Sequence, residues 1–261
     1  MDIKKLLLIV AMHASFISCT YTRSINSSEI KNPPNKNFVK VFKELILTRC
    51  AKKAQKKVKK CESKSSWSTG SGLLVDIIPN RATILTAGHV CSSSSNFPKE
   101  DKEYRYSWKE EIAVLNHNKK FYEAKLILAE QLTAKTSDLC TLEVPGLVNI
   151  MPTRKIRLAP RPPRTGENVY YMGAPMGIYH PPTALIIKGV YNGRINSHSS
   201  SVTAPAAPGA SGSVIMSYDH KVYSVLYAVH PGFRHATVGT SYDATKSFLL
   251  KTRRLLSSQK D

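Results

Sequence analysis

A short turn of small residues at 208–213, with the sequence PGASGS, carries a serine in a setting that suits nucleophilic chemistry. A serine hydroxyl attacks well only when its proton has an acceptor and the oxyanion that it generates meets preorganised N–H donors. The glycines permit a tight bend, so the amides of Gly209 and Ser211 can point at one spot beside the Ser211 hydroxyl. The turn predicts a nucleophile if a base and a carboxylate accompany it.

A histidine and an aspartate stand in settings that suit these two roles. Of the eight histidines, only His89 lies at the end of an apolar strand pattern, 82–86, among small residues. Asp138 interrupts the apolar face of the run 138–144, where a shielded carboxylate needs a partner. Taken singly, the three sites have ordinary interpretations as a plain turn, a surface or core histidine and a strand-edge aspartate. The catalytic interpretation depends on their occurring together.

The segments around these residues are predicted to be short β-strands, because their apolar and β-branched runs are bounded by turn residues. The predicted strands lie at 72–75, 82–86, 112–115, 121–128, 138–144, 168–173, 184–190, 213–216 and 222–229. Residues 152–163 are rich in proline and arginine and are predicted to connect two β halves. The apolar pattern of 241–256 predicts a closing helix, capped by Ser241 or Asp243, whereas 38–47 suits a helix and a strand equally.

The composition is that of a globular protein, with 261 residues and 42% hydrophobic residues. The net charge of +20 predicts attraction to anionic surfaces but does not select among nucleic acid, phospholipid, glycan and acidic protein. Six lysines at 52–60 form either a solvated surface loop or an anion-binding patch. No interleaved aromatic platform accompanies the basic residues, so nucleic-acid binding is not predicted as the main role.

The first 18 residues predict an export segment, because a positively charged start precedes an apolar core that is too short to span a membrane. The residues before Cys19 partly resemble a bacterial lipoprotein signal, so Cys19 is either lipidated or lies beside an ordinary cleavage point. Residues 19–37 are rich in serine, asparagine and proline and predict a flexible tether. The expected location is extracytoplasmic, either secreted or periplasmic, and a lipid on Cys19 is the one membrane contact that the sequence suggests.

Four of the five cysteines remain if Cys19 is lipidated or removed, and export allows them to pair. Cys50 and Cys61 flank the lysine-rich segment and can close a local loop, which leaves Cys91 and Cys140 as the other pair. The alternative is that all four are free buried thiols in a reducing compartment.

Three segments resemble the motifs of trypsin-like serine proteases. Residues 86–89 (TAGH) resemble the histidine motif, 137–139 (SDL) the aspartate motif and 208–213 the nucleophile loop, in the order of that superfamily. Residues 70–75 and 171–177 are further similar to segments of bacterial high-temperature-requirement peptidases and glutamyl endopeptidases.

The resemblance covers about residues 38–255 and implies an all-β fold. A protease domain over 38–256 would contain two packed six-stranded barrels, at about 38–150 and 165–256, with a C-terminal α-helix in the second part. The resemblance implies that His89 is the general base and then the acid, that Asp138 orients it and that Ser211 is the nucleophile. The amides of Gly209 and Ser211 would form the oxyanion hole, and no metal or organic cofactor is implied.

Two further expectations follow from the motifs. Cys91 and Cys140 each lie two residues beyond a motif residue, so neighbouring His89 and Asp138 would bring the sulfurs together. We therefore predict a Cys91–Cys140 disulfide, with the two Cα atoms within about 7 Å. Leu226 stands where glutamyl endopeptidases place a pocket histidine, so the expected preference is for a small or apolar side chain.

The leading hypothesis is an exported serine endopeptidase that hydrolyses protein or peptide substrates through an acyl-enzyme intermediate. The first alternative is a catalytically weak binding module of the same fold that holds an anionic partner through its basic surface. A nucleic-acid-binding protein is a third hypothesis, and it depends on charge alone.

Overall fold

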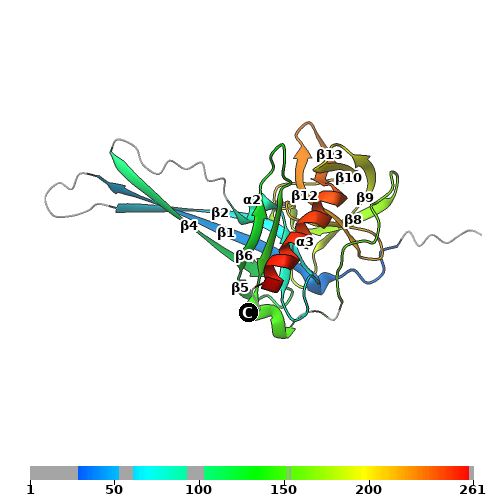
Figure 1. Cartoon of the computed structure of the whole chain (residues 1–261), viewed down its shortest axis with the longest axis horizontal. Coiled ribbons are helices and arrows are strands. Elements are labelled where there is room, and N and C mark those ends of the chain that lie inside the picture. Colours follow the sequence, from blue (N-terminus) through cyan, green and yellow to red (C-terminus); the bar gives the residue numbers. More distant parts are fainter. Residues whose placement is uncertain (1–28, 53–60, 93–102, 151, 153, 259–261) are drawn as a thin grey trace, which may run out of the picture. The chain divides into compact units, whose positions relative to one another are not determined.

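The computed structural model describes residues 29–52, 61–92, 103–150, 152 and 154–258 (Figure 1). The described residues from 31 to 258 belong to one compact unit, and of residues 1–30 only Glu29 and Ile30 are described. The predicted export segment 1–18, Cys19 and the first part of the predicted tether lie outside the described residues. So do all the lysines of 52–60 except Lys52.

The first half of the unit is a seven-stranded antiparallel sheet with the strand order β5-β4-β1-β2-β3-β7-β6. Its strands are β1 (Phe38–Ala51), β2 (Cys61–Val75), β3 (Thr83–Thr86), β4 (Tyr104–Leu115), β5 (Phe121–Glu123), β6 (Lys125–Glu130) and β7 (Leu139–Glu143). Only Ala124 separates β5 from β6, and its amide donates to the Ile112 carbonyl at 2.9 Å. The continuous segment 121–130 thus pairs with β4 through β5 and with β7 through β6. Because this segment forms both edges of the sheet, the sheet is strongly curved.

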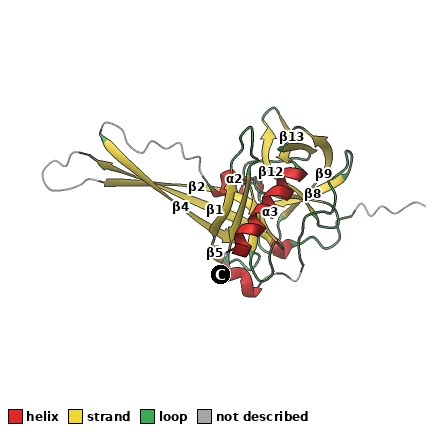
Figure 2. Ribbon diagram, in the orientation of Figure 1, coloured by secondary structure: helices red, strands yellow, loops and turns green. Residues whose placement is uncertain are grey.

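The second half is a closed barrel with the strand order β10-β13-β12-β11-β8-β9. Its strands are β8 (Asn168–Gly173), β9 (Leu185–Arg194), β10 (Ser199–Thr203), β11 (Val214–Met216), β12 (Val222–His230) and β13 (Phe233–Thr240). The helices are α2 (Gly88–Cys91), α3 (Tyr242–Ser258) and the short 3₁₀-helices η1 (Asn35–Asn37), η2 (Pro145–Ile150) and η3 (Pro175–Gly177) (Figure 2). The trypsin-like all-β class, the six-stranded second barrel and the C-terminal helix are confirmed. The first half is a seven-stranded sheet rather than the predicted six-stranded barrel, and the segment predicted as one strand, 121–128, divides at Ala124 into β5 and β6.

Helix α3 joins the two sheets. The Ser241 hydroxyl accepts from the Ala244 amide at 3.2 Å, so Ser241 is the predicted N-cap. Farther along, Lys251 Nζ lies 2.7 Å from Glu130 Oε1 on β6, and the Thr252 and Thr141 hydroxyls are 3.2 Å apart. Among the residues that the structure describes, no helix has the length and apolar character needed to cross a membrane.

Several strand assignments go beyond the sequence pattern. The ambiguous segment 38–47 is a strand, the first part of β1. Residues 61–71 extend β2 well before the predicted start at 72, and β10 and β13 have no predicted counterpart. The predicted connection 152–163 contains no regular helix or strand among its described residues, apart from one bridge between Leu158 and Val222.

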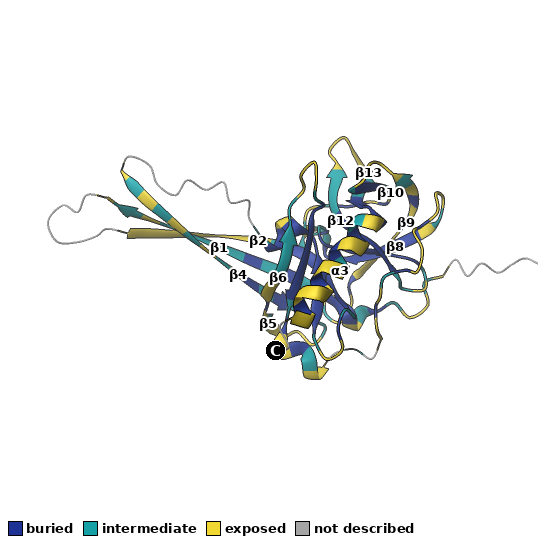
Figure 3. Cartoon of the chain, viewed as in Figure 1, coloured by how far each residue is buried: buried dark blue, intermediate teal, exposed yellow. Residues whose placement is uncertain are grey.

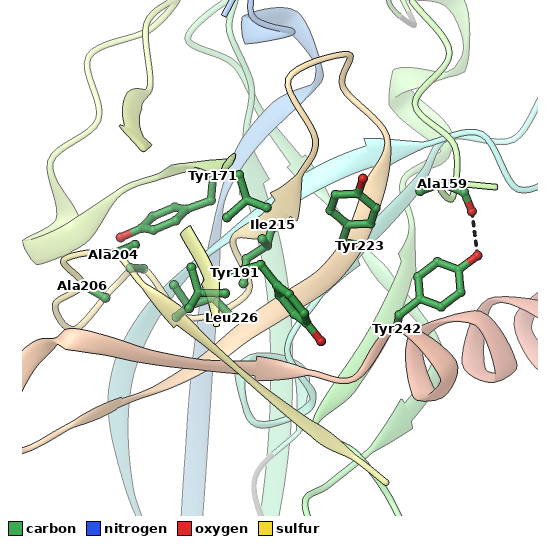
Figure 4. Close-up of a cluster of buried hydrophobic side chains, with 12 residues drawn as sticks. Ala159, Tyr171, Tyr191, Ala204, Ala206, Ile215, Tyr223, Leu226 and Tyr242 are labelled. Atoms are coloured by element: carbon green, nitrogen blue, oxygen red, sulfur yellow. Dashed lines mark hydrogen bonds between the residues drawn. The ribbon is translucent and has the colours of Figure 1, made fainter. Parts of the chain in front are cut away.

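Burial is greatest in the inner parts of the two sheets, whereas the outer halves of β1, β2 and β4, the short β5 and β6 and most of β9 are exposed or partly exposed (Figure 3). The core of the second barrel gathers small and aromatic side chains (Figure 4). Tyr171, Ile215 and Leu226 belong to this cluster, and the Tyr242 hydroxyl donates to the Ala159 carbonyl at 2.7 Å. The helix and the connection between the halves are thereby fixed to the same core.

The end of the predicted tether is fixed to the domain. Asn37 is buried, and its side-chain amide donates to the Leu74 carbonyl at 3.2 Å and to the Arg154 carbonyl at 3.1 Å. His220 Nε2 donates to the Lys31 carbonyl at 2.9 Å, so the contacts begin at the start of the unit.

Acidification is expected to destabilise the fold through His220. Burial lowers the pKa of His220 below its ordinary value of 6.5. Because Nε2 donates to Lys31, neutral Nδ1 accepts from the Tyr170 hydroxyl, and protonation would remove that acceptor. Neutral His220 contributes its full stability at pH values above the pKa that it has in the unfolded chain. That contribution is lost as the pH falls through the lower pKa that it has in the folded protein.

The melting temperature should therefore fall as the pH is lowered through and below 6.5, the ordinary pKa of histidine, and His220→Asn should reduce that fall. Asparagine tolerates the φ of 66° at this position. The matched control is His230→Asn at an exposed site, and equal pH dependence in the two variants would contradict the prediction.

Candidate active site

The structure brings His89 and Asp138 together. Thr86 at the end of β3 pairs with Cys140 on β7, so the turn that carries His89 lies beside the start of β7. Asp138 Oδ1 accepts from the His89 backbone amide at 2.8 Å, and Oδ2 pairs with His89 Nδ1. The His89 side chain is 47% exposed, whereas that of Asp138 is 6% exposed. The buried carboxylate therefore orients an imidazole whose other nitrogen, Nε2, can act on a substrate.

Helix α2 requires a glycine at its first position. A Cβ on Gly88 would lie 2.0 Å from the Glu130 carbonyl oxygen and 2.6 Å from Asp138 Oδ1. Residue 88 is therefore glycine because the turn packs directly on the carboxylate that His89 contacts.

Both predicted disulfides are present. Cys50 pairs with Cys61, and Cys91 pairs with Cys140 with a Cα–Cα distance of 6.4 Å, inside the predicted limit. The second bond ties α2 to β7, two residues beyond His89 and two beyond Asp138. Two disulfides indicate an oxidising, extracytoplasmic environment.

Replacing both Cys91 and Cys140 with alanine should lower the free energy of unfolding by about 4 kcal/mol, from the chain entropy of the loop that the bond closes. The bond joins residues 49 apart in the sequence, whereas the Cys50–Cys61 bond joins residues only 11 apart. The matched control, alanine at Cys50 and Cys61, should cost about 3 kcal/mol on the same argument. Urea unfolding measures both, and a larger loss in the control pair would contradict the prediction.

Lys43 supports the His89 turn from within the first sheet, which the sequence pattern did not suggest. This lysine on β1 is buried, and Nζ donates to the His89 carbonyl at 3.0 Å. Burial lowers the pKa of Lys43, and Glu110 Oε1, 4.0 Å from Nζ, acts in the opposite direction. A buried cation on the backbone of residue 89 restrains the position of the ring.

The loop that carries Ser211 is shaped by glycines with positive φ and by close contacts with the first sheet. Gly209 has φ of 92° and Gly212 has φ of 87°. A Cβ on Gly212 would lie 2.1 Å from both the Ser71 carbonyl oxygen and Thr86 Oγ1, and 3.1 Å from the Ala87 amide nitrogen. The loop therefore packs against the segment that leads into His89, and no other residue type fits at 212.

Ser71 holds the Ser211 loop from both ends. Its amide donates to the Ser211 carbonyl at 2.8 Å, and its hydroxyl donates to the Gly209 carbonyl at 2.8 Å and accepts from the Ala174 amide at 2.9 Å. Thr86 Oγ1 in turn donates to the Ser71 carbonyl at 2.7 Å. The available signal for Ser71 was a serine between two glycines in a strand, but the sequence reasoning assigned it no role.

The amides of the loop differ in their hydrogen bonding. Ala210 N, Gly212 N and Ser213 N donate at 3.0, 2.7 and 3.0 Å to the carbonyls of Ala207, Leu226 and Ala210. Within the described part of the chain, the amides of Gly209 and Ser211 have no such acceptor. These two amides are therefore available to donate to a group that approaches the loop.

Leu226, which stands at the predicted position of the specificity pocket, lies on β12 in the second barrel. Leu226 is 2% exposed and packs with Ala204, Ala206 and Ala210 in the buried cluster of Figure 4. His230, at the end of β12, is exposed. The Leu226 carbonyl accepts from the Gly212 amide at 2.7 Å, so a leucine and not a histidine lies at this point beside the Ser211 loop.

Comparison with known proteins agrees with this geometry. The family model described as trypsin-like peptidase domain matches residues 70–225, more than half of the chain. No match was found among curated protein sequences.

Two solved structures of the Rv3671c protease from M. tuberculosis have a similar fold. The active form has a TM-score of 0.59 and 15% sequence identity, over 87% of this chain and 85% of that one. An inactive mutant form from M. tuberculosis H37Rv has a TM-score of 0.55 and 15% identity, over 85% of this chain and 91% of that one. At these identities the likeness concerns the fold, whereas the family match covers the three motif segments. The chain belongs to the trypsin-like peptidase domain family and is a trypsin-like serine endopeptidase.

Proposed function

We propose that this protein is an exported endopeptidase that hydrolyses peptide bonds through Ser211, His89 and Asp138. The observation that carries the proposal is the pairing of His89 Nδ1 with a buried carboxylate, which leaves Nε2 available in a partly exposed side chain. The packing of Gly212 against Thr86 and Ala87 supports a position for Ser211 within reach of that nitrogen.

In the proposed reaction, His89 Nε2 removes the Ser211 hydroxyl proton as the oxygen attacks the substrate carbonyl. The amides of Gly209 and Ser211 donate to the oxyanion that forms, and Asp138 stabilises the imidazolium. His89 then gives the proton to the leaving amine, which departs from an acyl-enzyme. Water, activated by His89, attacks the ester and releases the second product. Ser71 and Lys43 are positioning residues that act through the loop and the turn that they hold.

The expected substrates are accessible segments of proteins or peptides. The buried alanines and Leu226 beside the Ser211 loop favour a small or apolar side chain on the acyl side. Export through residues 1–18 would place the enzyme in the secreted or periplasmic space, with a lipid anchor if Cys19 is modified. The net charge of +20, including the lysines at 52–60, favours substrates or surfaces that carry negative charge.

Labelling with a fluorophosphonate tests the proposal directly. The purified protein should turn over casein, and mass spectrometry should find one phosphonylated residue, Ser211, with loss of activity in proportion to labelling. Denatured protein is the control, because an unactivated serine does not react. Labelling elsewhere, or casein turnover that survives complete labelling of Ser211, would refute the assignment.

A further inference from the structure

Strand β2 has an unusually long open edge next to the Ser211 loop. Its pairing with β1 runs without a break from Phe38 opposite Leu73 to Cys50 opposite Cys61. On its other side, β3 pairs only with Leu73–Val75, and no other strand of the described chain pairs with residues 61–72. Figure 1 shows the outer parts of β1, β2 and β4 running together away from the rest of the sheet.

The direction of the backbone groups along this edge follows from Ser71. Its N–H donates to Ser211 and its C=O accepts from Thr86, so both groups point away from β1. Backbone groups alternate in direction along a strand, and the register with β1 is unbroken. The same groups therefore point outward at four residues, here called the β2 edge: Thr69, Trp67, Ser65 and Ser63. None of them has a backbone partner on that side within the described residues.

The side chains leave this edge accessible. Natural edge strands usually avoid new pairing by carrying prolines, bulges or many charges. Residues 63–69 are serine or threonine except for Lys64 and Trp67, and their ladder contains no bulge. Trp67 is 64% exposed, which provides a large apolar surface beside the open backbone groups.

The edge is held in an extended form before any partner binds. The Cys50–Cys61 disulfide closes its outer end, and Arg49 pairs with Glu62 at 2.6 Å one residue farther in. The Thr48 and Ser63 hydroxyls are 2.8 Å apart, and β4 supports the far side of β1 as far as Ala51 opposite Tyr104. A preformed strand loses little conformational entropy on binding an extended peptide.

Geometry assigns this edge to one side of the substrate. In the proposed reaction His89 gives its proton to the leaving amine, so the leaving segment faces the first sheet, which carries His89. Strand β2 belongs to that sheet and reaches the Ser211 loop at Ser71. The leaving segment runs away from Ser211 whereas β2 runs toward it, so the two chains are antiparallel.

We propose that the β2 edge binds the leaving-group side of an extended polypeptide substrate as an added antiparallel strand. This inference rests on the proposed function. With one substrate residue opposite each β2 residue, the stretch from Gly70 to Ser63 accommodates about eight residues, or roughly 26 Å at the rise of a strand. The substrate class is therefore an unfolded or extended chain that continues well beyond the cleaved bond, recognised mainly through its backbone.

A length series of peptides tests the proposal. The peptides copy the bond of unfolded casein that the enzyme cleaves fastest, with a fixed acyl side and two, four, six, eight or ten leaving-side residues. The kcat/KM value should rise on the order of tenfold between two and eight residues, because several backbone hydrogen bonds are added, and should then level off. Equal kcat/KM at all lengths would overturn the proposal.

Ser65→Pro removes one donor of the β2 edge without removing a hydrogen bond to β1, since the Ser65 N–H points outward. The variant should cleave the two-residue peptide like the native enzyme but lose the gain for six residues and longer. Ser65→Ala keeps the N–H and should behave like the native enzyme. If Ser65→Pro keeps the full length dependence, the proposal is wrong.

A scan of N-methylated peptides on the native enzyme decides the matter should the proline variant fold poorly. In an added strand, every second amide N–H points to β2 and the others point away from it. Methyl groups on the amides that point to β2 should reduce kcat/KM, and methyl groups on the other amides should not. A uniform effect would contradict strand addition. Sedimentation of the native enzyme tests the rival occupant of the β2 edge, which is a second copy of this chain. The assignment to substrate would be overturned if the native enzyme were a dimer, Ser65→Pro dissociated that dimer, and the dependence of kcat/KM on peptide length did not change. Absence of casein cleavage and of fluorophosphonate labelling would count against the proposed function instead.

Discussion

Replacing Ser211 with alanine is expected to lower kcat for peptide hydrolysis by about six orders of magnitude, the scale seen when a serine nucleophile that works with its base as a unit is removed. The alanine side chain has no oxygen to form the acyl-enzyme, and His89 and Asp138 then have no partner to activate. The remaining acceleration would come from substrate binding and the two amides of the loop. Single-turnover hydrolysis of a casein-derived peptide measures the loss.

Ser213→Ala is the matched control, because Ser213 lies in the same loop two residues away. Its hydroxyl is buried and has no hydrogen-bond partner among the described residues, so its loss should leave kcat within a few-fold of the native value. If Ser211→Ala retained more than about a hundredth of the activity, far above what loss of a nucleophile allows, another residue would have to be the nucleophile.

Asp138→Asn is expected to lower kcat by about four orders of magnitude with little change in the fold. The asparagine oxygen can still accept from the His89 amide, which preserves the bond now 2.8 Å long. The side-chain NH₂ would then face Nδ1 and require it as an acceptor. That tautomer places the ring proton on Nε2, which can no longer accept the proton of Ser211.

The matched control for this variant is Asp76→Asn. Asp76 directly follows the last residue of β2, and it pairs with Arg157 at 2.7 Å rather than with a histidine. Loss of that exposed ion pair should cost about 1 kcal/mol of stability or less and leave kcat near the native value. Similar kcat values for Asp138→Asn and the native enzyme would show that Asp138 does not orient His89 for catalysis.

Much of the candidate site could be predicted from local sequence. The bend at 208–213 needs glycine whatever surrounds it, and the predicted positions, Gly209 and Gly212, are the two with positive φ. His89 and Asp138 follow or begin apolar runs, and such runs form neighbouring strands in a small β protein. Their spacing from Cys91 and Cys140 then led to the disulfide that the structure contains.

Tertiary structure decided what depends on partners far along the chain. Residues 61–69 carry almost no apolar alternation, so nothing local indicates a strand, yet they extend because each faces a residue of β1. By sequence, Lys43 resembles a surface lysine in a segment that suits a helix and a strand equally. Only the packing of β1 against α2 buries its side chain beside the His89 carbonyl. Ser71 acquires its role because the second half returns the Ser211 loop to the first sheet.

The sequence by itself therefore determined which residues have the chemistry and in what order they come, since nucleophile, base, carboxylate and tight turn are properties of short segments. The tertiary structure decided how those segments are supported and that a long open edge of β2 begins beside Ser211. The physical reason is that backbone pairing in a sheet is made between segments distant in sequence, and its free energy depends on neighbours that no local pattern identifies.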